Sequence, residues 1–333
     1  MEQSTEKKKK INYGKLISDN MLIIILLVLC VVLAFIAPNF LMVSNLLNIL
    51  RNVSFQGVIA LGMTMVIISG EMDLSVGSGV AFYGCVLAYL TGKFYESGMG
   101  YGPAIGLSFI MIILLSIIIG AIEAVLRVNF NVPTFITTLA LMTILKGAGF
   151  LISGGFAITT FPTWFNFLGG GYIGGHIPFP ALILVVLSVI TVIIMAKTKL
   201  GRSIYAVGSN AEAARLSGIS VFKVKFFALA ATAALTAVSG TMIASQIMSG
   251  TPTVADGWEM NVISSVIIGG ASLSGGSGTV KGTLVGTVFL GVILNGMTLL
   301  GISEYWQYVV RGVLILAAVL INNIQARRKA VKI

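Results

Sequence analysis

Charged residues are scarce in this sequence, and acidic residues are the scarcest of them. Only 10% of the 333 residues are charged, and 11 Asp and Glu stand against 21 Lys and Arg. So little charge cannot cover a water-exposed surface, and the mean hydropathy of +1.01 lies far above the soluble range. The composition excludes an ordinary soluble domain, and the length suits one large membrane domain.

Cysteine and histidine are nearly absent as well. Cys30 and Cys85 both lie in apolar runs, and His176 is the single histidine. This argues against a disulfide framework or a cysteine-based metal site, and a lone histidine is expected to be structural. The sequence contains no HExxH or GxSxG motif and no Cys/His pairing, which disfavours an intramembrane enzyme. No metal site and no catalytic residue are expected.

The positive charge is concentrated in three polar segments. Fifteen of the 21 Lys and Arg fall within residues 7–15, 197–225 and 327–332. Such clusters flanking apolar runs indicate membrane topology rather than binding to nucleic acid, because short Lys- and Arg-rich loops stay cytoplasmic. Both termini and the central loop are therefore predicted on the cytoplasmic side of a cell membrane.

Long apolar runs are what the sequence has in abundance. A bilayer core of about 30 Å takes about 20 residues of helix. The first run follows a basic segment without a small-residue cleavage site, so it predicts a retained helix rather than a signal peptide. The predicted fold is an all-α polytopic membrane protein of about ten helices. The predicted spans are 21–37, 54–70, 76–92, 103–126, 134–153, 180–196, 222–246, 259–270, 280–300 and 304–323.

These spans divide the chain into five parts. The parts are a basic N-terminus (1–20), a first transmembrane half (21–196), a cytoplasmic loop (197–225), a second half (226–323) and a basic tail (324–333). The segment 259–270 is too short to span unaided, so it predicts a broken or re-entrant helix. Residues 154–180 lack Asp, Glu, Lys and Arg but are rich in aromatic residues. They are interpreted either as an outer loop lying on lipid headgroups or as a docking surface for an external partner.

The stretch "GEMDLSVGSG" contains two acidic residues, Glu71 and Asp73, between two predicted spans. Carboxylates are costly in lipid and normally face a cavity, a partner or water. Asp73 or Ser75 can accept from the free amides that open the next helix, and Gly70 and Gly77 permit a sharp turn. Helix capping beside a transport pathway is favoured, with direct participation in transport as the alternative.

A second glycine-rich stretch resembles the first. Residues 267–280 share Ile, Gly, Leu, Ser and Val positions with residues 67–80, and they include Gly275 and Gly276. Paired glycine-interrupted segments indicate internal duplication around a central pathway, although chance similarity is a real alternative in a chain with 39 glycines. Four polar residues within or beside apolar spans are candidates for the pathway: Asn48, Gln56, Asn261 and Asn295.

The central loop contains one short predicted helix, "SNAEAARLSG". Ser209 and Glu212 form an S-x-x-E capping box, and Gly218 can end the helix in the left-handed conformation. Two turns are too few for a stable isolated helix. The apolar face of Ala213, Leu216 and Ile219 suits docking in a groove on another protein, and an ordinary surface helix is the alternative.

Three motifs together resemble the permeases of ABC importers of the ribose and simple-sugar type. The resemblance covers nearly the whole chain, although Glu71 and Met72 depart from the residues usual in that family. The motif in the cytoplasmic loop matches at Gly208, Asn210, Ala213, Ala214, Arg215, Ser217 and Gly218. The motif in the first stretch matches at Gly70, Asp73, Leu74, Ser75, Val76, Gly77 and Ser78. The third motif is the late glycine-rich segment "GGASLSGGSGTVKGTLVG".

The resemblance implies a type II-like permease with broken glycine-rich segments that works with several partners. These are an ABC ATPase subunit that binds ATP–Mg, an extracytoplasmic sugar-binding protein, membrane lipid and a second permease copy, in a prokaryotic cell membrane. The chain itself has no Walker A motif, so hydrolysis must come from the partner. The residues expected to couple to the ATPase are Ser209, Asn210, Glu212, Ala213, Ala214, Arg215, Leu216 and Gly218. The alternative is a secondary transporter with an ion relay through Glu71, Asp73, Glu123 and Lys146.

Overall fold

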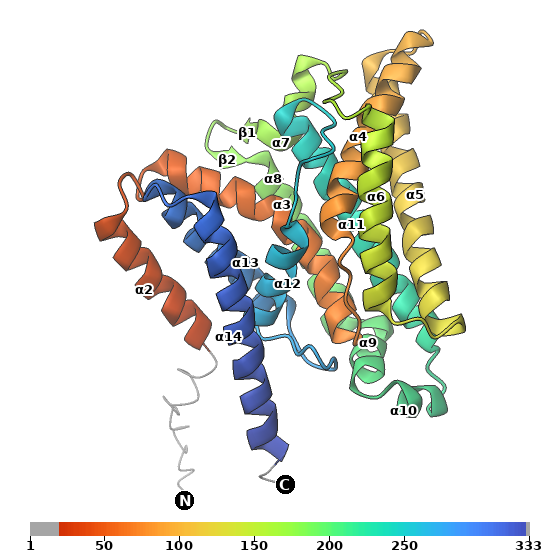
Figure 1. The fold of residues 1–333 in the computed structure, drawn as a ribbon, viewed down its shortest axis with the longest axis vertical. Coiled ribbons are helices and arrows are strands. Elements are labelled where there is room, and N and C mark those ends of the chain that lie inside the picture. Colours follow the sequence, from red (N-terminus) through yellow and green to blue (C-terminus); the bar gives the residue numbers. More distant parts are fainter. Residues whose placement is uncertain (1–19, 331–333) are drawn as a thin grey trace, which may run out of the picture.

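The computed structural model describes the backbone of residues 20–330 and the side chains of residues 20–320. The basic cluster at residues 7–15 and the side chains of the predicted tail (324–333) lie outside this part. All the long elements in the described part are helices (Figure 1). The helices are α2 (Met21–Ile36), α3 (Val43–Ile68), α4 (Val76–Glu96), α5 (Tyr101–Asn129), α6 (Thr134–Ser153), α7 (Phe167–Gly170), α8 (Phe179–Lys197), α9 (Lys199–Ser209), α10 (Ala211–Leu216), α11 (Val221–Ile247), α12 (Trp258–Ile268), α13 (Val280–Leu299) and α14 (Glu304–Ala330).

Each of the ten predicted spans corresponds to a helix, and six of these helices are long and apolar enough to cross a membrane. The six are α3, α5, α6, α8, α11 and α13. One difference from the prediction stands out, because helix α3 begins at Val43, well before the predicted start. Helix α12 has only 11 residues, in line with the short segment expected there.

Helix α11 lies at the centre of the fold and packs against α3, α4 and α5. It is rich in Ala, Ser and Thr, and such small residues let helix backbones approach closely. A Cβ added at Gly120 of α5 would lie 2.6 Å from Cα of Ala230 on α11. In the most apolar 18-residue stretch of each helix, 83% of α3 is buried but only 28% of α5. Helix α3 is therefore an inner helix, and most of α5 faces outward.

The aromatic segment 154–180 folds into a small cap at one end of the helices. It contains the 3₁₀ helix η1 (Thr163–Asn166), α7 and a short antiparallel hairpin of β1 (Tyr172–Ile173) and β2 (Ile177–Pro178). The side-chain amide of Asn166 donates to two carbonyl oxygens near the end of α11, at 3.2 Å and 3.1 Å. The cap therefore lies at the opposite end of the molecule from α9 and α10 (Figure 1).

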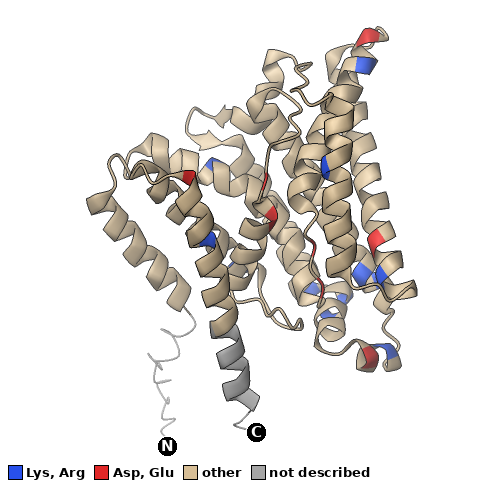
Figure 2. Cartoon of the chain, viewed as in Figure 1, with Lys and Arg blue, Asp and Glu red and all other residues tan. Residues whose placement is uncertain are grey.

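Charged residues gather toward the two ends of the long axis (Figure 2). Figure 2 shows a group of them around α9 and α10, another at the far tip of α4, and only scattered ones between these ends. The start of α2 and the end of α14 also lie toward the end that carries α10 (Figure 1). The central loop and the two terminal helix ends thus share one end of the molecule.

Candidate functional site

The first glycine-rich stretch forms a break of residues 69–75 between α3 and α4, called here the first break. Helix α3 ends in a Schellman motif, in which amides beyond the helix bond back across its last turn. The amide of Gly70 donates to Ile67 at 3.0 Å and that of Glu71 donates to Val66 at 3.0 Å. Gly70 has a φ of 82°, a left-handed conformation that glycine adopts without strain. The predicted sharp turn is therefore present.

The second glycine-rich stretch forms an equivalent break of residues 269–279 between α12 and α13, called here the second break. Gly270 has a φ of 92°, and its amide donates to Ile267, while the amide of Ala271 donates to Val266. Each break thus follows a helix that ends in the same hydrogen-bond pattern. The same pattern also ends α4 and α13, where the amides of Gly98 and Gly301 donate to Tyr95 and Thr298, so it does not distinguish internal duplication from chance similarity.

The two breaks meet in space, and the end of α9 lies against both of them. The amide of Gly276 in the second break donates to the carbonyl oxygen of Ile68 at 2.8 Å. A Cβ at Gly208, near the end of α9, would lie 1.7 Å from that same oxygen and 2.7 Å from the amide nitrogen of Gly276. Tyr205 of α9 also donates its hydroxyl to the carbonyl oxygen of Gly278 at 2.9 Å. We call this contact of three segments the glycine junction.

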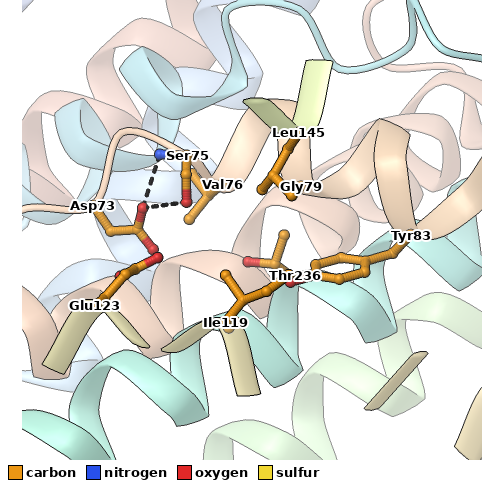
Figure 3. A pocket seen from close by; sticks show the side chains of 10 residues that line it. Asp73, Ser75, Val76, Gly79, Tyr83, Ile119, Glu123, Leu145 and Thr236 are labelled. Carbon is orange, nitrogen blue, oxygen red and sulfur yellow. Dashed lines mark hydrogen bonds between the residues drawn. The ribbon is translucent and has the colours of Figure 1, made fainter. Parts of the chain in front are cut away.

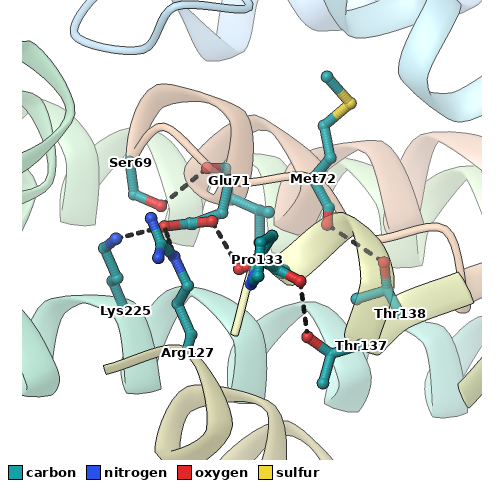
Figure 4. A network of polar contacts seen from close by, with 10 residues as sticks. Ser69, Glu71, Met72, Arg127, Pro133, Thr137, Thr138 and Lys225 are labelled. Carbon is teal, nitrogen blue, oxygen red and sulfur yellow. Dashed lines mark hydrogen bonds and ion pairs between the residues drawn. The ribbon is translucent and has the colours of Figure 1, made fainter. Parts of the chain in front are cut away.

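Glu71 lies in a buried ion-pair network beside the glycine junction (Figure 4). One carboxylate oxygen accepts from Nε of Arg127 on α5 at 2.7 Å and from Nζ of Lys225 on α11. The other oxygen accepts from the hydroxyl of Thr134, the first residue of α6, at 2.5 Å. Glu71 and Lys225 are both buried. The network therefore joins the first break to three helices that are distant from it in sequence.

Asp73 lies two residues before Ser75, the N-cap residue of α4, and the predicted side-chain cap on the first turn of α4 is not present. One of its carboxylate oxygens accepts from the amide of Ser75 at 2.8 Å and from the Ser75 hydroxyl at 2.7 Å. The Ser75 hydroxyl is thus a donor and does not itself cap the helix. Gly77 lies on the next turn, where a Cβ would lie 2.1 Å from a carboxylate oxygen of Glu259 on α12. The two halves of the chain therefore also approach closely where α4 meets α12, outside the breaks.

Helix α10 is present, but the predicted capping box is wrong. Helix α9, which was not predicted, continues through Ser209, so the Ser209 hydroxyl donates to the carbonyl of Tyr205 within that helix. Asn210 has extended backbone and caps α10 instead, and its side-chain oxygen accepts from the amide of Ala213 at 2.9 Å. The cap lies one residue later than expected because Ser209 belongs to α9. Asn is as good an N-cap residue as Ser, so Asn210 can take this position. Glu212 pairs with Arg215 rather than completing a box.

The end of α10 follows the prediction. Gly218 has a φ of 82°, and its amide donates to Arg215 while that of Ile219 donates to Ala214. Leu216 is 75% exposed, whereas Ala214 is buried and anchors the helix. Hydrogen bonds from the exposed Arg215 lower the pKa of the Glu212 carboxyl, so the pair is ionised at neutral pH. The exposed surface of α10 thus combines an apolar side chain with an ion pair.

The four polar pathway candidates do not form one cluster within the described residues. Asn295 on α13 exchanges hydrogen bonds with Asn45 on α3, and Asn48 accepts from Arg51 on the same helix. Asn261 is buried in α12, where its side-chain oxygen has no hydrogen-bond partner in the part of the chain that the structure describes. Gln56 is partly buried on α3, and no hydrogen bond links any two of the four.

The alternative ion relay does not form a continuous chain. Lys146 pairs with Asp256 at 2.9 Å in an exposed contact, and Glu71 is occupied by its network. Only Asp73 and Glu123 face one another (Figure 3). Among residues 20–320, no group of three or more His, Cys, Asp or Glu is placed to hold a metal ion.

Sequence reasoning did not identify the partners of the breaks. Lys225 was read only as part of the basic loop, and Arg127, Thr134 and Tyr205 were not singled out. The available signal was the position of Lys225 and Arg127 within otherwise apolar helical segments, where an ionisable side chain normally has a partner. Nothing in the local pattern indicated that this partner would be Glu71.

Comparison with known proteins identifies the class to which this architecture belongs. The family model described as "Branched-chain amino acid transport system / permease component" matches residues 45–319. The chain belongs to this family, and it is the permease component, not the catalytic subunit, of an ABC transport system. The resemblance inferred from the three motifs is thereby confirmed.

Individual relatives match over nearly their whole length. The Haemophilus influenzae ribose import permease protein is 37% identical over 320 residues, covering 95% of this chain and 96% of the relative. The Bacillus subtilis ribose import permease protein is 36% identical over 332 residues, covering 97% and 98%. The L-arabinose ABC transporter permease protein of Azospirillum brasilense is 34% identical over 320 residues, covering 96% and 92%. No solved structure matches the chain.

Proposed function

We propose that this chain forms the translocation pathway of an ATP-driven, binding-protein-dependent importer for ribose or a similar simple sugar. Support comes from relatives at 36–37% identity that are named ribose import permeases, and from others named for arabinose and xylose. Each of these matches covers at least 90% of this chain. A pentose is therefore the substrate class that we would test first.

The observation that carries the proposal is how the segments on either side of α10 contact the first break. Before α10, Gly208 packs against the carbonyl of Ile68 at the end of α3. After α10, Lys225 in the second turn of α11 binds Glu71 in the first break. A movement of α10 therefore has two direct contacts through which to move the break. Packed elements that shift between discrete positions can carry a movement from one site to another, here from the α10 surface to the first break.

The remaining partners follow from this arrangement. An ABC ATPase subunit that binds ATP–Mg docks on α10 through Leu216 and the ion pair beside it. An extracytoplasmic sugar-binding protein docks at the opposite end, on the cap of residues 154–180. A second copy of this chain completes the pathway as a homodimer, and lipid covers the outward faces of α5, α6 and α8, which are mostly unburied. Both termini lie on the cytoplasmic side of a prokaryotic cell membrane, with α10.

The breaks line or border the pathway in this proposal. Gly70, Gly275 and Gly276 give the breaks their left-handed turns, and Asp73 and Ser75 fix the start of α4. The polar side chains along the pathway would be those of Asn48, Gln56, Asn261 and Asn295. Since these four do not cluster in one subunit, the sugar would meet them in succession rather than in one fixed site.

Two substitutions in and beside α10 test coupling directly. Arg215→Glu places two acidic groups side by side on the docking surface, and Gly218→Val forces a β-branched residue into a left-handed turn. In membrane vesicles that contain the native partners, both changes should abolish ATP-dependent ribose uptake while the protein still accumulates in the membrane. The ATPase should copurify with the wild-type chain in mild detergent and should be lost from Arg215→Glu.

Lys93→Glu serves as the control, because Lys93 also forms an exposed i,i+3 ion pair but lies in the last turn of α4, a helix that ends far from α10 (Figure 1). It should leave uptake and ATPase binding unchanged. Normal uptake by both α10 variants would rule out the coupling role. Uptake of arabinose or xylose but not ribose would retain the importer and change its substrate.

A further inference from the structure

Two carboxyl groups face each other inside the fold, and no Lys or Arg of the described side chains lies between them (Figure 3). Asp73 lies in the first break and Glu123 on α5, and each is only 1% exposed. They border a small cavity between α4, α5, α6 and α11, and their side chains point toward one another (Figure 3). Neither carboxyl belongs to the Glu71 network, so the pair is a separate feature of the fold.

The hydrogen bonds around the pair are incomplete. One oxygen of Asp73 accepts two bonds from Ser75. The Oε2 atom of Glu123 is fully buried and has no hydrogen-bond partner in the described part of the chain. A buried carboxylate oxygen without a donor is costly, so this atom indicates a group that the protein atoms alone do not provide.

The charges near the pair do not balance without an additional positive charge. Lys225 and Arg127 both bind Glu71, and no Lys or Arg within residues 20–320 forms an ion pair with Asp73 or Glu123. The third titratable side chain on the cavity is Tyr83, which is neutral at ordinary pH and adds no positive charge. Three ionised carboxylates would face two cations in this region, leaving one negative charge uncompensated.

We propose that Asp73 and Glu123 form a proton-binding site in which the two carboxyl groups share a single proton. Oε2 of Glu123 carries the proton and donates it in a hydrogen bond to the oxygen of Asp73 that Ser75 does not occupy. Two adjacent carboxylates that cannot both ionise in a buried site adopt this arrangement. The shared proton neutralises the region and ties the first break to α5.

The lining of the cavity favours a proton over a metal ion. Hard cations take about six or more oxygen ligands. Here Val76, Ile119 and Leu145 make much of the wall apolar. The Thr236 hydroxyl donates to the carbonyl oxygen of Thr232 at 2.8 Å, so its hydrogen is not available to Glu123. A proton needs only the two carboxyl oxygens that face each other.

Infrared spectroscopy of the full-length protein in lipid nanodiscs tests the site, independently of any transport function. A protonated buried carboxyl gives a C=O band that should persist at neutral pH and shift in heavy water. Glu123→Gln should remove this band. Asp73→Asn should shift or remove it, because the carboxylate acceptor becomes an amide and the charge balance no longer requires the proton. Glu96→Gln, which alters an exposed glutamate at the end of α4, should leave it unchanged. Absence of the band, or its survival in Glu123→Gln, would overturn the proposal.

Thermal unfolding provides a second measurement that does not require the band to be resolved. The folded protein keeps a proton that an exposed glutamate releases above about pH 4.3. Raising the pH above that value should therefore destabilise the fold, by up to about tenfold in the folding equilibrium per pH unit. Glu123→Gln should reduce this dependence, and Glu96→Gln, which alters an exposed glutamate, should not. Sodium and choline chloride are then compared. If sodium alone raises the unfolding temperature of the wild type, and has no effect on Glu123→Gln, the site binds a metal cation and the proton assignment is wrong.

Discussion

At the scale of the residue, the most heavily bonded side chain of the first break is Glu71. Its two oxygens accept from Arg127, Lys225 and Thr134, which come from three different helices. A carboxylate held in this way is fixed in place and is not free to exchange protons or ions. Glu71 therefore has a structural role at the break, whereas no Lys or Arg among residues 20–320 pairs with Asp73 or Glu123.

The Glu71 network should be a major contributor to stability. Removing one partner from a buried ion pair typically costs about 3–5 kcal/mol, because the remaining charge stays buried and unpaired. We expect Glu71→Gln to lower the free energy of unfolding by about 3 kcal/mol, measured by denaturant titration in mixed micelles. Adding Lys225→Met should recover part of the loss, because it removes the unpaired charge.

The exposed pair of Lys93 and Glu96 supplies the control for this experiment. Exposed ion pairs contribute little, so Glu96→Gln should show no measurable loss of stability. If Glu71→Gln is no more destabilising than Glu96→Gln, the network does not hold the break in place.

At the scale of the element, the end of α9 depends on having no side chain at Gly208. A Cβ there would lie 1.7 Å from the carbonyl oxygen of Ile68, so Gly208→Ala must push α9 away from the glycine junction. Changes within a coupling path typically alter coupling by about 0.5–2 kcal/mol, which is about 2- to 30-fold. We expect Gly208→Ala to lower the rate of ATP-dependent uptake in vesicles by a factor within this range. The ATPase should remain bound and active.

Gly106 of α5 offers the matched control, because nothing lies within 4 Å of a Cβ added there. Gly106→Ala should leave uptake unchanged, since alanine is tolerated better than glycine inside a helix. Equal uptake by Gly208→Ala and the wild type would show that α9 does not transmit movement to the breaks.

The elements were largely predictable from sequence, and their contacts were not. The spans follow from long apolar runs, and the turn at Gly218 follows from a glycine after a helix-forming segment. Helix α9 was missed because "KLGRSIYAVGS" is too polar for a span and lies in a loop. The capping box was wrong by one residue because helix ends depend on where the preceding element stops. The ion pair of Glu71 with Lys225 joins distant segments, and no local pattern encodes such a contact.

At the scale of the whole molecule, α10 and the aromatic cap should lie on opposite sides of the membrane. Leu216 is 75% exposed on α10, and Phe156 is 80% exposed at the cap. In a chain whose Cys30 and Cys85 are replaced by Ala, we expect Leu216→Cys to react with an impermeant maleimide only from the cytoplasmic side. Phe156→Cys should react only from the outer side, in intact cells.

Maleimide labelling of intact cells reports cysteines on the outer side, and labelling of inverted vesicles reports those on the cytoplasmic side. Opening the membrane with detergent gives the total labelling of each cysteine. Reaction of both cysteines from the same side would contradict the topology. Reaction from opposite sides, but with Leu216→Cys on the outside, would keep the fold and reverse its orientation.

The contact between Gly276 and Ile68 also has a consequence for the order in which the protein is made. The ribosome produces α3 long before the second break, so the amide that bonds to the Ile68 carbonyl does not yet exist when the first half enters the membrane. The same delay applies to Lys225, the buried cation beside Glu71. The first half must therefore wait in the bilayer with its break unfinished, and the closing contacts of the fold belong to the last stages of biosynthesis.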